Sequence, residues 1–190
     1  MTPGRATGLR LSLALGLLLV LISSAMAKDP FRVEQIQTRL DGGVYYLNAS
    51  IDYRFSDEAL EALDNGVPLT IVTHIQVRRV NAWLWEDSLL DLQLRHAIRY
   101  KPLSARYEVY RIPGDHGRGF ETREAAIRAL GAFTDQPLLN QDELEPEQEY
   151  EVQIQVALDI EELPLPLRPQ AYLTRAWKLS SKWSKWPLTP

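Results

Sequence analysis

The sequence contains no cysteine. Disulfide bonds, thiol nucleophiles and a lipid-modified N-terminal cysteine are therefore excluded, and the fold must be held together by packing alone. Common signatures of catalysis are missing as well, because no serine lies in a G-x-S-x-G pattern and the chain has neither an H-E-x-x-H pattern nor a phosphate-binding loop. We therefore expect no enzymatic activity and no bound cofactor.

The chain also has no excess of basic residues. It contains 21 lysines and arginines against 25 aspartates and glutamates. Only two of the basic residues and none of the acidic ones lie in residues 1–27, so the remaining 163 residues carry a net charge of −6. Nucleic acid requires a basic face and anionic lipid attracts cations, so this charge argues against a nucleic-acid partner and against simple electrostatic docking on lipid.

Long apolar runs are missing except for one, at residues 11–22. It follows Arg5 and Arg10 and precedes Ala25 and Ala27, which form an A-x-A pattern. This three-part pattern is typical of a secretory signal peptide and predicts cleavage after Ala27. The run falls short of the ~20 residues that a membrane-spanning helix needs. We therefore expect a bacterial periplasmic protein without an integral span, with an uncleaved inner-membrane anchor as the alternative.

Most of the chain after residue 27 alternates between apolar and polar residues, which is typical of strands with one buried face. The clearest run is 45–55, where the odd-numbered residues are mostly apolar and the even-numbered ones mostly polar. A tight turn at Asp41-Gly42-Gly43 precedes it, because glycine supplies the positive φ that hairpin turns require. The predicted strands are 31–40, 45–55, 68–80, 87–100, 103–112, 149–160 and 172–179.

Two short helices are predicted, with Ser56 capping one that ends at Asn65-Gly66 and Thr122 capping one that ends near Gly131. Three other segments read as irregular: a glycine-rich loop at 113–119, an acidic loop at 137–147 and an extended, polyproline-like path at 163–169. Crossover helices between successive strands are missing, which disfavours a parallel sheet. We expect residues 28–190 to form one mainly β, antiparallel β-sandwich-like domain with two short helices.

Exposed tryptophans are the first candidates for contacts with a partner or ligand. Trp83 and Trp85 lie at an expected corner between two strands, and Trp183 and Trp186 lie in the C-terminal tail beside lysines. Tryptophan favours membrane interfaces, so the tail could face a membrane. We favour the other interpretation, in which the tail folds back on the sandwich and the lysine stems cover the indole rings.

The glycine-rich loop is the second candidate. His116 lies in it, and its backbone amides together with Arg111 or Arg118 could bind an anion. The other two histidines, His74 and His96, are 22 residues apart in sequence and lack a metal-ligand spacing. We expect them to be ordinary strand residues and expect no metal site.

The sequence resembles a family of exported proteobacterial proteins known as a domain of unknown function, often labelled "proline-rich signal peptide protein". The resemblance covers essentially the whole chain after residue 27 and implies no activity, catalytic residue or cofactor. Members tend to be encoded beside a membrane sensor kinase resembling nitrogen regulators, which implies that kinase as a partner. The stretches that carry the resemblance are Trp83–Asp87, Ile98–Tyr100 with Leu103-Ser104 and Tyr107, Leu158–Ile160, Leu163–Pro169, and Trp177, Ser180-Ser181, Trp183 and Trp186-Pro187.

Three hypotheses for the function follow. The first is a non-enzymatic periplasmic binding or accessory module that contacts another envelope protein. The second is a carrier of a small molecule or lipid, which requires a deep apolar pocket between the sheets, lined by residues such as Tyr45, Tyr53 or Trp83. The third is an unrecognised hydrolase, which requires converging polar groups around the loop at 113–119.

Overall fold

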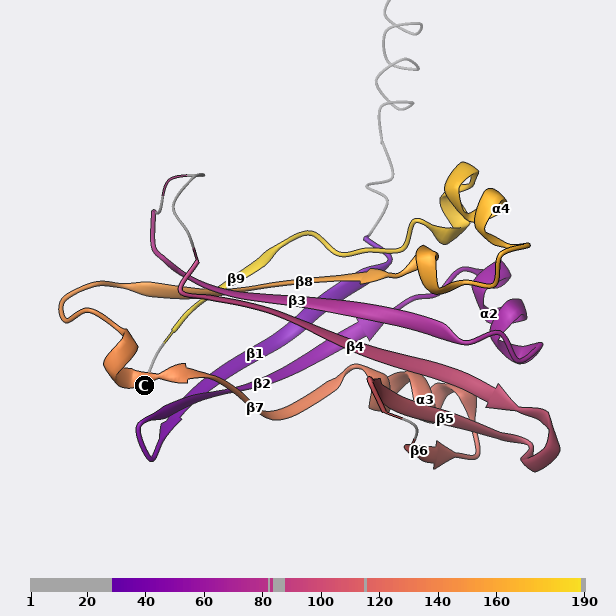
Figure 1. The fold of residues 1–190 in the computed structure, drawn as a ribbon, viewed down its shortest axis with the longest axis horizontal. Helices are drawn as coiled ribbons and strands as arrows, with labels where there is room; N and C mark the ends of the chain where they lie inside the picture. Colours follow the sequence, from indigo (N-terminus) through magenta and orange to yellow (C-terminus); the bar gives the residue numbers. More distant parts are fainter. Residues whose placement is uncertain (1–28, 82, 84–87, 115, 189–190) are drawn as a thin grey trace, which may run out of the picture.

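The computed structural model describes residues 29–81, 83, 88–114 and 116–188. Its strands form two antiparallel sheets, one of three strands in the order β1-β2-β7 and one of six strands in the order β6-β5-β4-β3-β8-β9 (Figure 1). The strands are β1 (Phe31–Asp41), β2 (Val44–Tyr53), β3 (Leu69–Arg79), β4 (Leu90–Lys101), β5 (Arg106–Ile112), β6 (Gly117–Phe120), β7 (Ala132–Asn140), β8 (Tyr150–Leu158) and β9 (Ser184–Pro187).

Three α-helices and four short 3₁₀ turns connect the strands. The helices are α2 (Asp57–Asp64), α3 (Arg123–Leu130) and α4 (Arg168–Leu173), and the turns are η1 (Pro102–Ser104), η2 (Gln141–Glu143), η3 (Ile160–Glu162) and η4 (Arg175–Trp177). In the part of the chain that the structure describes, no helix is both long and apolar enough to cross a membrane.

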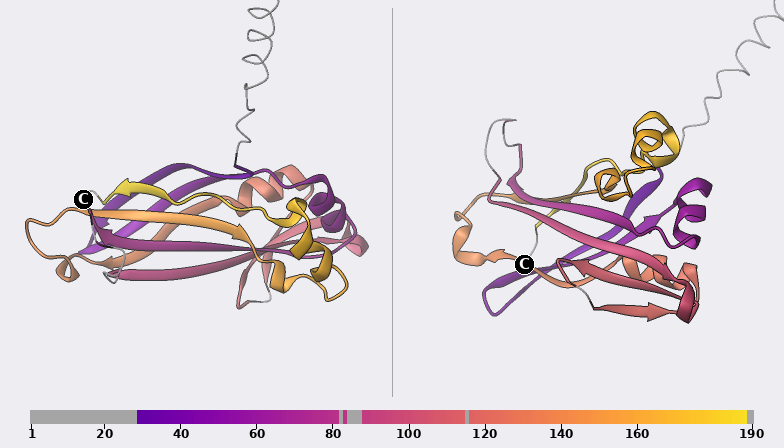
Figure 2. Two further views of the ribbon diagram at one scale, coloured as in Figure 1. Left: turned by 90° about the horizontal axis from the view of Figure 1, so that it is seen from above. Right: turned by 45° about the vertical axis from the view of Figure 1, so that its right-hand side comes forward.

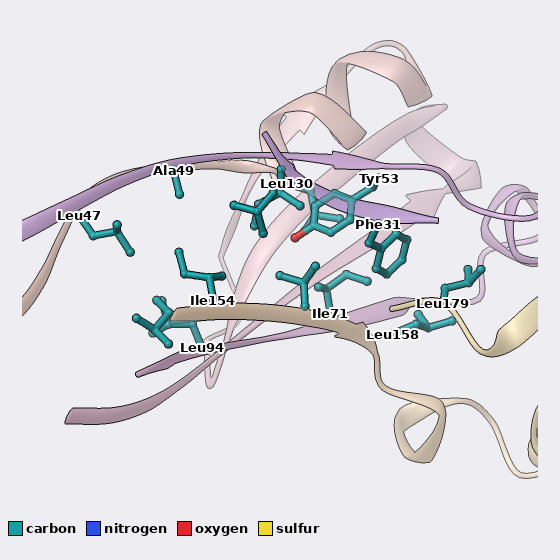
Figure 3. Close-up of a cluster of buried hydrophobic side chains, with 14 of the residues drawn as sticks. Phe31, Leu47, Ala49, Tyr53, Ile71, Leu94, Leu130, Ile154, Leu158 and Leu179 are labelled. Carbon is teal, nitrogen blue, oxygen red and sulfur yellow. The ribbon is translucent and has the colours of Figure 1, made fainter. Parts of the chain in front are cut away.

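The two sheets pack face to face, with β1 and β2 crossing the strands of the six-stranded sheet obliquely (Figures 1 and 2). The expected antiparallel sandwich-like fold is confirmed. Between the sheets, Leu47 and Tyr53 of β2 point towards Ile71 of β3 and Ile154 of β8 (Figure 3), and all four side chains are buried. Burial of such side chains stabilises the fold by about 1.5–3 kcal/mol each, which explains how it holds without disulfides.

Local sequence signals explain the first two helices. The Oγ of Ser56 accepts a hydrogen bond from the Ala59 amide at 3.1 Å, and the Oγ1 of Thr122 accepts one from the Ala125 amide at 3.2 Å. Both capping predictions are confirmed. Each helix buries only two residues of a short apolar stripe, so both lie at the margins of the core.

Two loop predictions were wrong in part. Residues 117–119 belong to β6, which pairs with β5, so only the first part of the expected glycine-rich loop is irregular. The expected acidic loop at 137–147 begins inside β7, which pairs with β2. In addition, residues 102–104 form η1 and not the start of a strand. For β6 and β7 the pairing partner decides the conformation, and local composition carries no information about that partner, whereas η1 begins at Pro102.

The C-terminal predictions were also wrong in part. Residues 163–169 do not run extended, because the Leu167 amide donates to the Pro164 carbonyl at 2.9 Å and α4 begins at Arg168. Pro169 lies in the first turn of α4, where its missing N–H and fixed φ are tolerated. Residues 172–179 contain the end of α4 and η4, and not a strand. The tail instead adds β9 to the edge of the six-stranded sheet beside β8.

Candidate functional site

The outer face of the six-stranded sheet is polar along its strands β3 and β8. In the register of the sheet, Gln76 of β3 lies between Asp91 of β4 and Gln153 of β8, and Gln153 lies opposite Lys185 of β9. These four side chains form one row across four strands. The inward-facing neighbours on β3 and β8, by contrast, are core residues, so strand alternation places this polar row on the outer face, where Gln153 itself is only 8% exposed.

A groove of about 370 Å³ lies on this outer face at the β9 edge. Its size falls within the range of small-ligand sites. We call it the outer groove, and its lining residues are Gln76, Arg78, Arg79, Val80, Asn81, Glu151, Gln153, Trp183 and Lys185.

An aspartate fixes the polar side chains at one side of the outer groove. Asp91 Oδ1 lies 2.5 Å from Nε2 of His74, and Asp91 Oδ2 accepts a hydrogen bond from Nε2 of Gln76 at 2.9 Å. The hydrogen bond with His74 lowers the pKa of Asp91 below its usual value, and the Gln76 amide adds to this effect. The Gln76 side chain is therefore held in place by Asp91 at the outer groove.

An aromatic side chain, Trp183, also lines the outer groove. The ring of Trp183 lies 5.2 Å from the ring of His74, centroid to centroid, and 37% of Trp183 is exposed. The preceding backbone is tied to β8, because the Ser181 amide donates to the Val156 carbonyl at 2.8 Å and the Val156 amide donates to Oγ of Ser181 at 3.1 Å. Trp183 thus presents a fixed, partly exposed aromatic surface to the outer groove.

Charged side chains complete the lining. Lys185 Nζ and Gln153 Nε2 both donate to Oε1 of Glu151, at 2.9 and 2.6 Å. Arg78 donates to the carbonyl of Trp83 at 3.0 Å, and Arg79 donates to Glu145. With Arg78, Arg79 and Lys185 against Glu151, the lining carries two more positive than negative charges.

This arrangement is suited to holding a ligand. It offers an aromatic face, amide groups that both donate and accept hydrogen bonds, and cations that attract carboxylates. Because the polar side chains are held by one another, little conformational entropy is lost when a ligand binds.

The tryptophans predicted as contact residues fall in different places. Trp183 lines the outer groove, and Trp83 is 73% exposed beside it, with its carbonyl bound to Arg78. Trp186 lies opposite Val152 in the register of β8 and β9, so it is on the other face of the edge strand. Trp85 lies outside the described residues.

The residues predicted around the glycine-rich loop lie at the opposite edge of the same sheet. Arg111 is on β5 opposite His96, and Arg118 is on β6 with its guanidinium 4.8 Å from the ring centroid of Phe120. His116 is exposed just before β6. Because β6 and β9 are the two outermost strands of the sheet, the structure does not bring these residues to the outer groove.

The two strand histidines face opposite sides of the sheet. His74 contacts Trp183 on the outer face, whereas His96 contacts Phe133 of β7, between the two sheets, with 5.4 Å between ring centroids. Burial and the nearby Arg111 lower the pKa of His96 below its usual value. Among the described residues, no group of three or more histidine, cysteine, aspartate or glutamate side chains is arranged to hold a metal ion.

Sequence reasoning missed most of the outer groove. Gln76, Arg78, Gln153 and Lys185 were not among the predicted site residues. The polar faces of the strands at 68–80 and 149–160 were visible in the sequence, but nothing there indicated that these strands are neighbours. That pairing joins residues about 75 positions apart, for example Gln76 and Gln153.

A second cavity, of about 660 Å³, opens at one end of the sandwich between the sheets. Of the residues named for a carrier pocket, Tyr45 lines this cavity, with Tyr150 and Leu144. Tyr53 does not, because it is buried in the core against Phe31 with 4.9 Å between ring centroids. Trp83 is not among the lining residues either.

Comparison with known proteins gives one match. A family model described as "Domain of unknown function (DUF4390)" matches residues 28–187, so the chain belongs to this family. No curated protein and no solved structure matches the chain.

Proposed function

We propose that this member of the DUF4390 family is an exported, non-catalytic binding module of the bacterial cell envelope. Its outer groove holds an extended, carboxylate-bearing segment of another envelope protein, and a membrane sensor kinase is the first partner to test. The observation that carries this proposal is the outer groove itself, in which a partly exposed indole and mutually fixed polar side chains lie on the outer face of the sheet.

The chemistry of the lining supports a polypeptide segment as the ligand. Gln76, which is half-buried, can donate to a backbone carbonyl and accept from a backbone amide, and the buried Gln153 supports the floor of the groove by donating to Glu151. Trp183 offers a face for an apolar or aromatic side chain, and tryptophan is enriched among residues that dominate binding energy at interfaces. The cationic groups of Arg78, Arg79 and Lys185, of which Arg79 also binds Glu145 and Lys185 also binds Glu151, can form charged hydrogen bonds with a segment that carries carboxylates.

A non-catalytic role is supported by the same geometry. Polar side chains in and beside the outer groove are paired with one another, as in Lys185 with Glu151 in the lining and His74 with Asp91 next to it. A hydrolase would need a nucleophile next to a general base, or two carboxylates with separated pKa values, in a common pocket. The hydrolase hypothesis also relied on the loop at 113–119, half of which is the strand β6.

The experiment is capture of the partner from intact envelopes by a photo-crosslinking residue at position 76. Position 37, on the outer surface of the three-stranded sheet, serves as the matched control site. We expect a discrete crosslinked protein from position 76 and none from position 37. Identical products from both positions, or no product from position 76, would contradict the proposal.

Two substitutions test whether the groove residues hold the captured protein. Lys185→Glu reverses a charge in the groove, and Lys101→Glu is its matched control, because each lysine is exposed and binds a largely buried glutamate at 2.9 Å. Trp183→Ala removes the aromatic side chain of the groove. Its matched control is Tyr110→Ala, which removes an aromatic side chain on β5, towards the other edge of the sheet. Capture should fall by roughly tenfold or more in the groove variants, as for interface hot spots, and stay unchanged in the controls.

A second candidate function is the carriage of a small apolar molecule, favoured by the 660 Å³ cavity beside Tyr45. Leu144→Arg would place a charge in this cavity, at a residue that does not line the outer groove. Native mass spectrometry of the protein isolated from envelopes should then show a bound molecule that is lost in this variant. A protein of the bare polypeptide mass would contradict carriage.

A further inference from the structure

The C-terminal part of the chain has a charge pattern unlike the rest. From Leu163 to Pro190 there are five basic residues and no acidic one, whereas residues 28–162 carry a net charge of −11. The five are Arg168, Arg175, Lys178, Lys182 and Lys185. The overall negative charge of the exported chain therefore conceals a separate basic segment.

Apolar side chains are exposed in the same segment. Leu165 is 73% exposed, Leu173 is 84% exposed and Tyr172 is 48% exposed. They belong to the turn at Pro164–Leu167 and to α4, which has only six residues and therefore spans about 9 Å. They lie on one small protrusion at an end of the sandwich (Figure 1), which we call the α4 ridge.

The α4 ridge is anchored rigidly to the fold. Leu163, Ala171 and Trp177 are buried on its inner side, and Nε of Arg168 donates to the Leu163 carbonyl at 2.7 Å. The exposed leucines are therefore not parts of a loop that could fold inwards.

Exposed basic side chains flank the α4 ridge on its C-terminal side. Arg175 and Lys178, directly after α4, are exposed. Acidic residues also lie close by. Asp159 and Glu162 both bind Arg95, Glu161 accepts a hydrogen bond from Tyr172, and the acidic helix α2 packs against η4. Exposed leucines flanked by exposed cations are the combination that binds the surface of an anionic bilayer.

The start of the described chain lies beside this segment. Asp29 Oδ2 is 3.5 Å from Nζ of Lys182. The apolar run 11–22 ends only seven residues before Asp29, and seven residues reach at most about 25 Å. The part of the domain near Asp29 is thus within about 25 Å of the bilayer while that run is in the membrane, whether it is later cleaved or not.

We propose that the α4 ridge docks the exported protein on the surface of an anionic phospholipid bilayer, with Leu165 and Leu173 entering the interface and Arg175 and Lys178 contacting lipid phosphates. This surface is separate from the outer groove, so the protein can lie on the membrane while the groove holds its partner.

The test is co-sedimentation of the chain from Lys28 onwards, which contains every described strand and helix, with vesicles. We expect binding to vesicles of equimolar phosphatidylglycerol and phosphatidylcholine, weakening as salt is raised, and little binding to pure phosphatidylcholine. In the double variant Leu165→Ser/Leu173→Ser, binding should weaken by roughly a hundredfold, at about tenfold for each leucine removed from an apolar environment.

The matched control is Leu103→Ser, where Leu103 is fully exposed in η1 between β4 and β5. The connection between these two strands is well separated from α4 in Figure 1. It should bind vesicles like the unmodified chain. Arg175→Gln/Lys178→Gln should weaken binding roughly 30-fold, at about 1 kcal/mol for each cation.

Three results would overturn the proposal. One is the absence of vesicle binding by the unmodified chain, or vesicle binding that stays unchanged in the leucine and charge variants. Another is binding that appears only when residues 1–27 are retained, because the apolar run alone would then be responsible. The third is a dimer in sedimentation analysis that Leu165→Ser/Leu173→Ser converts to a monomer, because a second copy of the chain would then cover the ridge.

Discussion

Replacing Ser181 by alanine tests how the C-terminal segment is fixed to the sandwich. Ser181 is buried, and its amide and Oγ satisfy both backbone groups of Val156 on that side of β8. Ser181→Ala removes the hydroxyl acceptor and leaves the Val156 amide buried without a partner. An unsatisfied buried donor costs about 1–3 kcal/mol, which corresponds to a fall in Tm of roughly 4–8 °C near the middle of that range.

The assay is thermal unfolding followed by circular dichroism, with Ser180→Ala as the matched control. Ser180 is the exposed neighbour of Ser181 and forms the backbone bridge with Ala157. The control should change Tm by less than about 2 °C, since exposed substitutions away from such contacts usually cost under 0.5 kcal/mol. Equal Tm values for the two variants would refute the inference that the Ser181 hydroxyl anchors the approach to β9.

Two further predictions concern positions outside the groove. In Gly131→Ala, the new Cβ would lie 2.1 Å from the Ile51 carbonyl oxygen, so we expect a loss of more than about 2 kcal/mol of unfolding free energy in urea, whereas Gly119→Ala, without such a clash, should lose far less. Burial and the nearby Arg111 lower the pKa of His96 in the folded protein. At pH values near and below the ordinary histidine pKa of 6.5, the unfolded chain therefore binds more protons than the folded chain does. The free energy of unfolding should consequently fall as pH decreases through that region. His96→Gln should weaken this dependence in unfolding measured across pH, and an unchanged profile would contradict it.

Much of the fold follows from local patterns. The alternation at 45–55 predicts β2 with its buried face, and the caps at Ser56 and Thr122 predict α2 and α3. These signals are local because a strand face and a helix start depend on residues only a few positions apart.

The missed elements depend on distant partners. β7 has no regular alternation of buried and exposed residues, contains Pro137 and shifts register against β2, so its sequence carries little strand signal. β9 has four residues and is a strand only because β8 is beside it. The prolines at 164–169 suggested an extended path, but proline is equally compatible with a turn and with the first turn of a helix.

The outer groove could be predicted only in part. Trp183 was a candidate from its residue type alone. Gln76 and Gln153 became site residues because β3 pairs with β8, a contact between parts of the chain that no local pattern connects. Arg111, His116 and Arg118 were grouped by their proximity in sequence, and the order of strands places them at the other edge of the sheet.

The most direct test of the central proposal is an NMR titration of the ¹⁵N-labelled chain from Lys28 with the partner segment captured by crosslinking. The indole N–H signal of Trp183 and the side-chain amide signals of Gln76 and Gln153 should shift together and saturate at one affinity. Signals of β5 and β6, including Arg111 and Arg118, should remain in place. Shifts confined to β5 and β6, with an unmoved Trp183 indole, would contradict the assignment of the outer groove as the binding site.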